Sequence, residues 1–256
     1  MGGEQAQRIY KDIMAAYSRK NGPSLPKDAF ARQQTDRMAR EISDVLASDE
    51  LILYILNKNR EHHMSSLDHM LRAGMSYNIV TLICPDDLKP VGRKTIEVVA
   101  FVHDAGKIYM PQELLAKPGR LTQHEFEIMK CHNMLSATLL RKLEPKYPGI
   151  TEISLGHHNY PRTGNDRRAC ERRRIYFGID FDRRECERRK CDRRRYDPSI
   201  EAAAKILMIC DIFDALSSPR DYKEPWQRQD VRAELEKEFE RYKSVVQKLY
   251  LMFPRN

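Results

Sequence analysis

The sequence predicts an all-α fold, and three observations support this prediction. Apolar residues recur at helical spacing through most of the 256 residues. No stretch alternates apolar and polar residues with the period of two that is typical of a half-buried strand. Glycine is scarce, with 11 residues in the chain, and Gly and Pro tend to fall between the periodic segments. A chain of this length also has ample material for a hydrophobic core.

The first elements are two amphipathic helices over residues 4–20 and 27–48, separated by the breaker Asn21-Gly22-Pro23. Either Ser48 or Asp49 is a suitable N-cap for the helix that follows through LILYILNKN.

Six further helices are predicted downstream. Thr122 and Glu125 form a capping-box pattern at the start of one of them, and Pro85 ends another. The predicted helices cover about 66–84, 92–107, 122–143, 150–158, 199–217 and 227–252. Ligand or substrate sites in such a protein are expected between facing helices.

The composition predicts two domains, one of them interrupted. Residues 1–49 read as an N-terminal helical segment and residues 50–256 as the main helical domain. An Arg-rich insertion at about 159–198 divides the second domain and contains a repeat of period 16, with DRRACERRR at 166–174 and DRRECERRK at 182–190.

The net charge of +8 belongs almost entirely to this insertion. Residues 162–196 contain 14 Lys and Arg against 7 Asp and Glu, so the rest of the chain is nearly neutral. The arginines of 166–195 have three interpretations: attraction of an anionic substrate, docking of an acidic protein partner, or a solvated flap with local ion pairs. Nucleic acid is an unlikely partner because acidic residues recur in every repeat.

The cysteines and the hydropathy predict a cytoplasmic protein that does not enter the membrane. No apolar run approaches the roughly 20 residues that cross a bilayer, and the start of the chain is polar and amphipathic. Without an export signal, we expect the six cysteines to be reduced thiols. They are Cys84, Cys131, Cys170, Cys186, Cys191 and Cys210.

Candidate metal ligands lie on several predicted helices, flanked by apolar residues. Asp211 is the clearest, because it follows the apolar run ILMIC, where a solvated carboxylate is improbable. The full candidate set is His69, His103, Asp104, His132, His157, His158 and Asp211. By contrast, His62, His63 and His124 fall outside this pattern and are interpreted as surface residues.

Five imidazoles and two carboxylates are more ligands than one ion can use. Imidazole with carboxylate suits iron, manganese or zinc better than calcium or magnesium. An aspartate can bridge two metals through its two oxygens. Two metals about 3.5–4 Å apart can hold a bridging hydroxide and clamp a phosphate for in-line attack.

Two long motifs resemble those of the HD-GYP branch of the HD phosphohydrolase superfamily. The segment HDAGKIYMPQELLAKPGRLTQHEFEIMKCH, starting at His103, resembles the family's signature. The segment AAKILMICDIFDALSSPRDYK, which contains Asp211 and Asp214, resembles its closing motif. The resemblance covers roughly residues 50–235 and is most specific between 98 and 140.

This resemblance implies an HD-domain helical bundle and a metal-dependent phosphodiesterase acting on a cyclic dinucleotide, cyclic di-GMP above all. It implies two divalent metal ions, with iron or manganese favoured and zinc also open. One ion would be held by His69, His103, Asp104 and Asp211, and the other by Asp104, His132, His157 and His158. Asp104 and Lys107 would be the catalytic residues, with Lys107 stabilising negative charge on the bridging hydroxide or the phosphoryl oxygens. Arg220 and Lys223 would bind substrate phosphate.

The chain departs from the family pattern around the double histidine. In HHNYPRTGND, Tyr160-Pro161 remain, but the glycine before them and several loop residues are missing. Asn159 stands where a glutamate is usual, and Ser65 stands where some members place a ligand for a third metal. An alternative is therefore a signalling module that binds cyclic di-GMP or a protein without hydrolysing it.

Overall fold

The computed structural model describes residues 2–18, 26, 28–83, 91–158, 197–218 and 225–253. Within these ranges every regular element is a helix, so the prediction of an all-α fold is confirmed.

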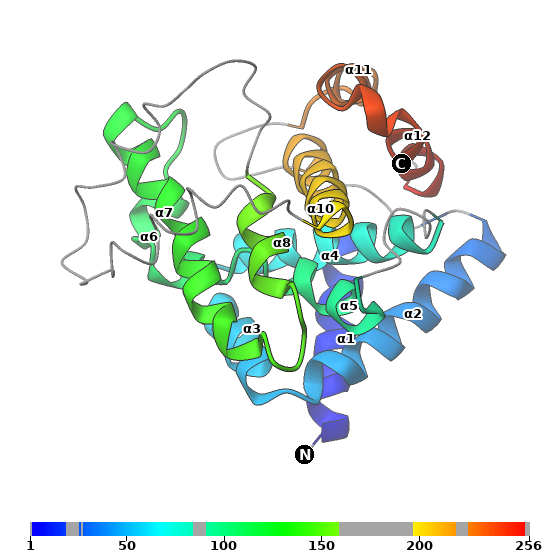
Figure 1. Cartoon of the computed structure of the whole chain (residues 1–256), viewed down its shortest axis with the longest axis horizontal. Coiled ribbons are helices and arrows are strands. Elements are labelled where there is room, and N and C mark those ends of the chain that lie inside the picture. The colour runs from blue at the N-terminus through cyan, green and yellow to red at the C-terminus, as the bar shows by residue number, and fades with distance from the viewer. Residues whose placement is uncertain are drawn as a thin grey trace.

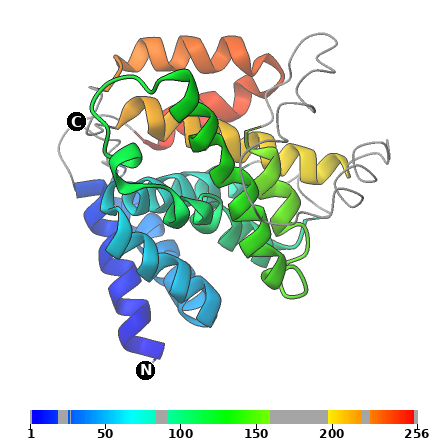
Figure 2. The ribbon, with the colours of Figure 1, turned by 90° about the vertical axis from the view of Figure 1, so that its left-hand side faces the viewer.

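Helices α1 (Gly2–Ser18), α2 (Ala29–Ala47) and α3 (Glu50–His62) form the N-terminal part. α1 and α2 pack side by side at the end of the molecule where the chain begins (Figure 2). The side chain of Asp49 accepts hydrogen bonds from the backbone N–H groups of Leu51 and Ile52, so Asp49 is the N-cap of α3. Ser48 instead ends α2.

Two helices form the centre of the molecule, α4 (Met64–Ile83) and α10 (Pro198–Ser217). Every residue of α4 from Ser66 to Thr81 is buried, and α10 is buried along most of its length. A helix that is apolar on all sides is expected in the interior of a bundle. The two helices pack against each other, with the other helices around them (Figure 1). Polar side chains on α4 and α10 therefore project into the protein rather than into solvent.

The segment between these two helices wraps around one side of them. It contains α5, α7 and α8 together with shorter elements, and α7 packs closely on the 3₁₀ helix η2. The bounds are α5 (Arg93–Val102), η2 (Ala105–Tyr109), α6 (Gln112–Leu115), α7 (Gln123–Leu140), η3 (Arg141–Leu143) and α8 (Ile150–Gly156). The helix expected over 92–107 thus ends at Val102, and the chain turns at His103 and Asp104 before η2. The short helix α6 was not predicted.

The single helix expected over 227–252 was wrong. The structure has α11 (Arg228–Glu238), the 3₁₀ turn η6 (Glu240–Tyr242) and α12 (Lys243–Met252). The chain leaves helical geometry at Phe239, whose φ and ψ are −123° and 51°. A continuous helix of that length would extend for about 39 Å. The break lets α11 and α12 each bury apolar residues against α10 and α4.

One hydrophobic core runs through the described residues. It includes Ile13 of α1 and Leu46 of α2 together with Leu207 of α10. The division into residues 1–49 and 50–256 stays a prediction, and most of the Arg-rich insertion at 159–198 lies outside the described residues.

Candidate metal centre

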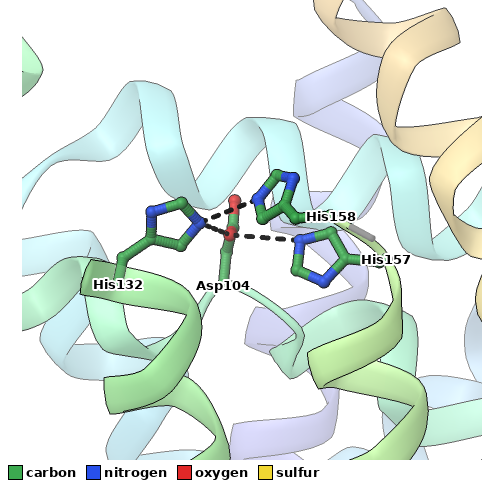
Figure 3. Close-up of side chains that lie close together, drawn as sticks. All are labelled: Asp104, His132, His157 and His158. Atoms are coloured by element: carbon green, nitrogen blue, oxygen red, sulfur yellow. Dashed lines mark hydrogen bonds and ion pairs between the residues drawn. The ribbon is translucent and has the colours of Figure 1, made fainter. Parts of the chain in front are cut away.

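The structure brings all seven predicted ligands together in two groups that share Asp104. They come from five places in the fold: α4, the turn after α5, α7, the end of α8, and α10. The first group is His69, His103, Asp104 and Asp211, and the second is Asp104, His132, His157 and His158. These are the two ligand sets that the sequence predicted. Figure 3 shows the second group, with the imidazole rings gathered around the carboxylate of Asp104.

The first group is buried on all four residues. Nε2 of His69 lies 2.7 Å from Oδ1 of Asp211 and 3.8 Å from Oδ2 of Asp104. Nε2 of His103 lies 3.4 Å from Oδ2 of Asp104 and 3.7 Å from Oδ1 of Asp211. The four ligand atoms lie within 4.8 Å of one another. Donors that share an ion at about 2.0–2.2 Å stand roughly 3–4.4 Å apart, so this group has the dimensions of a single-ion site.

The second group uses the other oxygen of Asp104. Oδ1 lies 3.1 Å from Nε2 of His132 and 3.8 Å from Nε2 of His157. Nε2 of His132 lies 3.0 Å from Nε2 of His158, which is the one exposed member. Because Oδ2 faces the first group and Oδ1 the second, the carboxylate of Asp104 stands between the two groups (Figure 3).

Backbone carbonyls fix the tautomers of three of the histidines. Nδ1 of His103 lies 2.7 Å from the carbonyl of Ala100, and Nδ1 of His132 and of His157 contact the carbonyls three residues before them. A carbonyl can only accept, so each Nδ1 carries the proton and donates it. The lone pair is thereby left on Nε2, the atom that points into the group.

The buried atoms at the centre lack hydrogen-bond partners among the described residues. Nε2 of His103, Nε2 of His157 and Oδ1 of Asp104 are each buried without such a bond. Buried polar atoms are nearly always satisfied, and an unmade bond here costs about 1–3 kcal/mol. Three unsatisfied lone-pair donors facing one space fit divalent ions, which would be bound by those lone pairs.

The charges of the first group show how strongly it favours a cation. Burial alone would lower the pKa of His103, but the carboxylates of Asp104 and Asp211 outweigh it and raise that pKa to about 10. Burial alone would raise the pKa of Asp104, whereas Lys107 and the neighbouring histidines hold it well below its ordinary value. In the second group, burial and two neighbouring imidazoles hold the pKa of His157 well below the ordinary value.

Lys107 lies beside the shared carboxylate. Its Nζ is 2.5 Å from Oδ2 of Asp104, and its side chain is largely buried. η2 produces this contact by bringing position 107 back one turn after Asp104. An ammonium has three N–H donors, so Lys107 can bind Asp104 and still donate to another anion.

Gly106 explains how His132 reaches Asp104. A Cβ at this position would lie 2.2 Å from the carbonyl oxygen of His132 and 2.5 Å from the backbone nitrogen of Ser136. Only glycine lets η2 approach α7 this closely. The backbone N–H of Gly106 also donates to Oγ of Ser136 at 2.8 Å. This contact sets the spacing between α7 and the turn that carries Asp104.

Sequence reasoning missed the partners of the second nitrogen of His69. Its Nδ1 lies 2.7 Å from Oδ2 of Asp214, and Arg72 donates two hydrogen bonds to the same carboxylate. Asp214 was noted only as part of the closing motif, and Arg72 was not noted at all. The available signal was one charge of each sign on two otherwise apolar helices, α4 and α10.

The remaining predicted residues divide into two kinds. Arg220 and Lys223 lie outside the described residues, as does the repeat at 166–195. His124 is exposed, as expected. The interpretation of His62 and His63 as surface residues was incomplete, because both are half-buried and Nε2 of His62 lies 2.7 Å from the carbonyl of Met110.

Comparison with known proteins identifies relatives of this centre. A model of the HD domain family matches residues 61–216. A cyclic di-GMP phosphodiesterase of Thermotoga maritima is 31% identical over 217 residues, which are 83% of this chain and 50% of the relative. The cyclic di-GMP phosphodiesterase response regulator RpfG of Xanthomonas campestris is 30% identical over 223 residues, 80% of this chain and 52% of the relative.

A more distant relative, 3'3'-cGAMP-specific phosphodiesterase 2 of Vibrio cholerae, is 27% identical over 135 residues, 52% of this chain and 21% of its own length. The chain spans about half the length of the first two of these relatives. Among the described residues, no helix combines the length and the apolar character needed to cross a bilayer.

Proposed function

The chain belongs to the HD domain family, and from this membership we propose that it is a metal-dependent phosphodiesterase that hydrolyses a cyclic dinucleotide. The observation that carries the proposal is the pair of ligand groups sharing Asp104. A phosphodiester bears negative charge at the attacked phosphorus, and two adjacent cations are suited to neutralise it.

Two ions are proposed, one in each group. His69, His103 and Asp211 would hold the first ion, His132, His157 and His158 the second, and Asp104 both. The donors are imidazole and carboxylate, which favours iron or manganese and keeps zinc open. Bound there, such ions would lower the pKa of water to provide a nucleophile and would neutralise charge on the phosphate.

The chain's own residues would orient the reactants. The carbonyl-bound Nδ1–H groups keep the imidazoles neutral and aimed at the centre, so the ligands need little rearrangement. We assign Lys107 to charge stabilisation, because its ammonium already contacts Asp104 and can donate to a phosphoryl oxygen beside it. Arg220 and Lys223 are proposed to bind substrate phosphate.

The proposed substrate is cyclic di-GMP, with other 3',5'-linked cyclic dinucleotides as the nearest alternatives. This proposal rests on the names of the relatives, which include cyclic di-GMP and 3'3'-cGAMP phosphodiesterases. An acidic protein partner for residues 166–195 and a cytoplasmic location both stay predictions from the sequence.

A second candidate function is binding of the cyclic dinucleotide without turnover. The shortened loop after His158, which lacks the family's glycine and has Asn159 in place of a glutamate, favours it. Against it stands the completeness of both ligand groups, which a binding module would not need for chemistry.

The test is turnover by the full chain, purified without oxygen and loaded with iron or manganese. We expect loss of cyclic di-GMP and appearance of the linear dinucleotide. Cyclic di-AMP, 3'3'-cGAMP and a chromogenic phosphodiester serve as comparison substrates. Tight binding of cyclic di-GMP to the metal-loaded protein without hydrolysis would support the second candidate, and hydrolysis of the chromogenic substrate alone would contradict the proposed substrate class.

A further inference from the structure

We infer that Arg72 and Asp214 are positioning residues for the first ion, and that they tie its ligand His69 to helix α1. This inference rests on the metal centre of the proposed function. It concerns how strongly one ion is held, and it extends the centre to the N-terminal helix, a part of the chain that supplies no ligand.

Asp214 holds His69 from the side opposite the ion. Its Oδ2 lies 2.7 Å from Nδ1 of His69, whose Nε2 faces Asp211. With Nδ1–H donating to Asp214, Nε2 keeps its lone pair for a cation. A carboxylate acceptor also makes the imidazole a more basic ligand than a carbonyl acceptor does. Asp214 is 1% exposed, so this contact is shielded from solvent.

Arg72 fixes the position of that carboxylate. Its Nε donates to Oδ1 of Asp214 at 2.6 Å and its Nη2 donates to Oδ2 at 3.1 Å, the two-pronged geometry in which guanidinium and carboxylate planes match. Ser218 donates a further hydrogen bond to Oδ1 at 2.8 Å. Asp214 therefore has little freedom to turn away from His69.

The connection continues from Arg72 to α1. Nη1 of Arg72 donates to the carbonyl of Ala16 at 3.3 Å. The hydroxyl of Tyr17 donates to the backbone carbonyl of Arg72 at 2.9 Å. The ring of Tyr17 is buried and stacks on Phe253 with ring centroids 5.8 Å apart. A displacement of the end of α1 would thus move Arg72, then Asp214, and then the ring of His69.

The second group has no counterpart of this arrangement among the described residues. Nδ1 of His132 and of His157 is held by carbonyls of the same helical turn, which a side-chain substitution leaves in place. A positioning role for Arg72 therefore predicts a selective effect on the first ion. A merely structural role would weaken the binding of both ions.

The experiment is a Co²⁺ titration of the metal-free full chain, with cobalt as the probe of both groups. In Arg72→Met we expect one class of Co²⁺ sites to weaken by about 10- to 100-fold, the range typical for loss of a partner behind a ligand, and the other class to keep its Kd. Arg72→Lys should recover part of the loss, because it keeps the charge without the paired donors.

Double variants identify which class has changed. His158→Ala should weaken the class that Arg72→Met leaves intact, so combining these two should weaken both classes. Combining Arg72→Met with Asp211→Asn should add little, because both act on the first ion. Unchanged Co²⁺ binding in Arg72→Met, or equal weakening of both classes, would overturn the inference.

Tyr17→Phe is the variant that decides the matter if Arg72→Met does not fold. It keeps the buried ring and removes only the hydroxyl that holds Arg72, so the first class should weaken by about two- to tenfold. No change in either class would overturn the link to α1. Hydrolysis is not part of this readout, so a chain that binds two Co²⁺ selectively but hydrolyses no cyclic dinucleotide would contradict only the proposed function.

Discussion

The two halves of the metal centre are built by different means. In the first half, buried charges hold His69 from behind, through Asp214 and Arg72. In the second half, backbone carbonyls of the same helical turn hold His132 and His157. All ligands of the first half are buried, whereas the second half has its one exposed ligand in His158.

This difference separates what each half depends on. The first half depends on contacts between distant segments, α1, α4 and α10, and is sensitive to any change that moves them. The second half depends on the local geometry of α7 and α8 and on the close approach of η2 to α7. Asp104 is the residue that the two halves share, so it is where they can be broken together.

Replacement of the shared carboxylate should have the largest effect. Asp104→Ala removes a ligand from both groups and leaves Lys107 without its anionic partner. We expect loss of both ions and a fall in turnover of at least about a thousandfold, equal to about 4 kcal/mol of activation free energy. Metal analysis and turnover would be measured on the same preparation. A variant that keeps two ions, or most of its activity, would contradict the sharing of Asp104.

A wedge between η2 and α7 should damage the second half selectively. The added methyl of Gly106→Ala would meet two backbone atoms of α7, at 2.2 and 2.5 Å. We expect the free energy of unfolding to fall by about 1–3 kcal/mol or more, and Co²⁺ binding by the second group to weaken more than that by the first. Gly92→Ala is the matched control, because its Cβ would have no neighbour closer than 4.0 Å. Equal stability of the two variants would show that η2 and α7 do not need this contact.

A smaller, pH-dependent effect is expected where α7 begins. Nζ of Lys117 donates to Glu125 at 2.7 Å, and the backbone N–H of Thr122 donates to the same carboxylate at 2.7 Å. Together these hydrogen bonds lower the pKa of Glu125 from 4.5 to about 2.

Because the folded-state pKa is the lower one, Glu125 stabilises the fold above pH 4.5, and this contribution disappears as the pH falls from 4.5 toward 2. Denaturation of metal-free wild type and Glu125→Gln should therefore give a small difference in stability at pH 7 that shrinks below pH 4.5. A difference that stays constant down to pH 3 would assign it to something other than this ionised carboxylate.

The smallest effect is expected at Cys131, next to His132. Its Sγ lies 3.4 Å from the carbonyl of Glu127, and burial raises the pKa of the thiol, which disfavours the nucleophilic thiolate. Cys131→Ser should keep turnover within about twofold of wild type. Complete loss of turnover with both ions retained would instead point to a covalent route through this thiol.

The sequence predicted the fold class and the ligand set because both depend on local patterns. Helical spacing of apolar residues is visible without knowing any contact, and Asp211 stood out because a carboxylate inside an apolar helix needs a partner. The family motifs then grouped the ligands around Asp104. These parts of the structure were accessible because each depends on neighbours in the sequence or on a known pattern.

The parts that the sequence did not predict depend on contacts across the fold. Arg72 and Asp214 lie 142 residues apart, and neither has a local feature that identifies the other as its partner. The break at Phe239 has a similar origin, since α11 and α12 bend to fit against α10 and α4 rather than at a Gly or Pro. The interpretation of His62 missed the carbonyl of Met110 for the same reason.

The most direct test of two half-sites sharing one carboxylate is the number of metal ions in the wild-type chain. The protein would be purified without oxygen, saturated with iron or manganese, freed of unbound metal and analysed for metal per chain, with turnover of cyclic di-GMP measured on the same sample. We expect two ions per chain, with turnover rising as the second ion binds. A fully active preparation that holds one ion per chain would contradict the account.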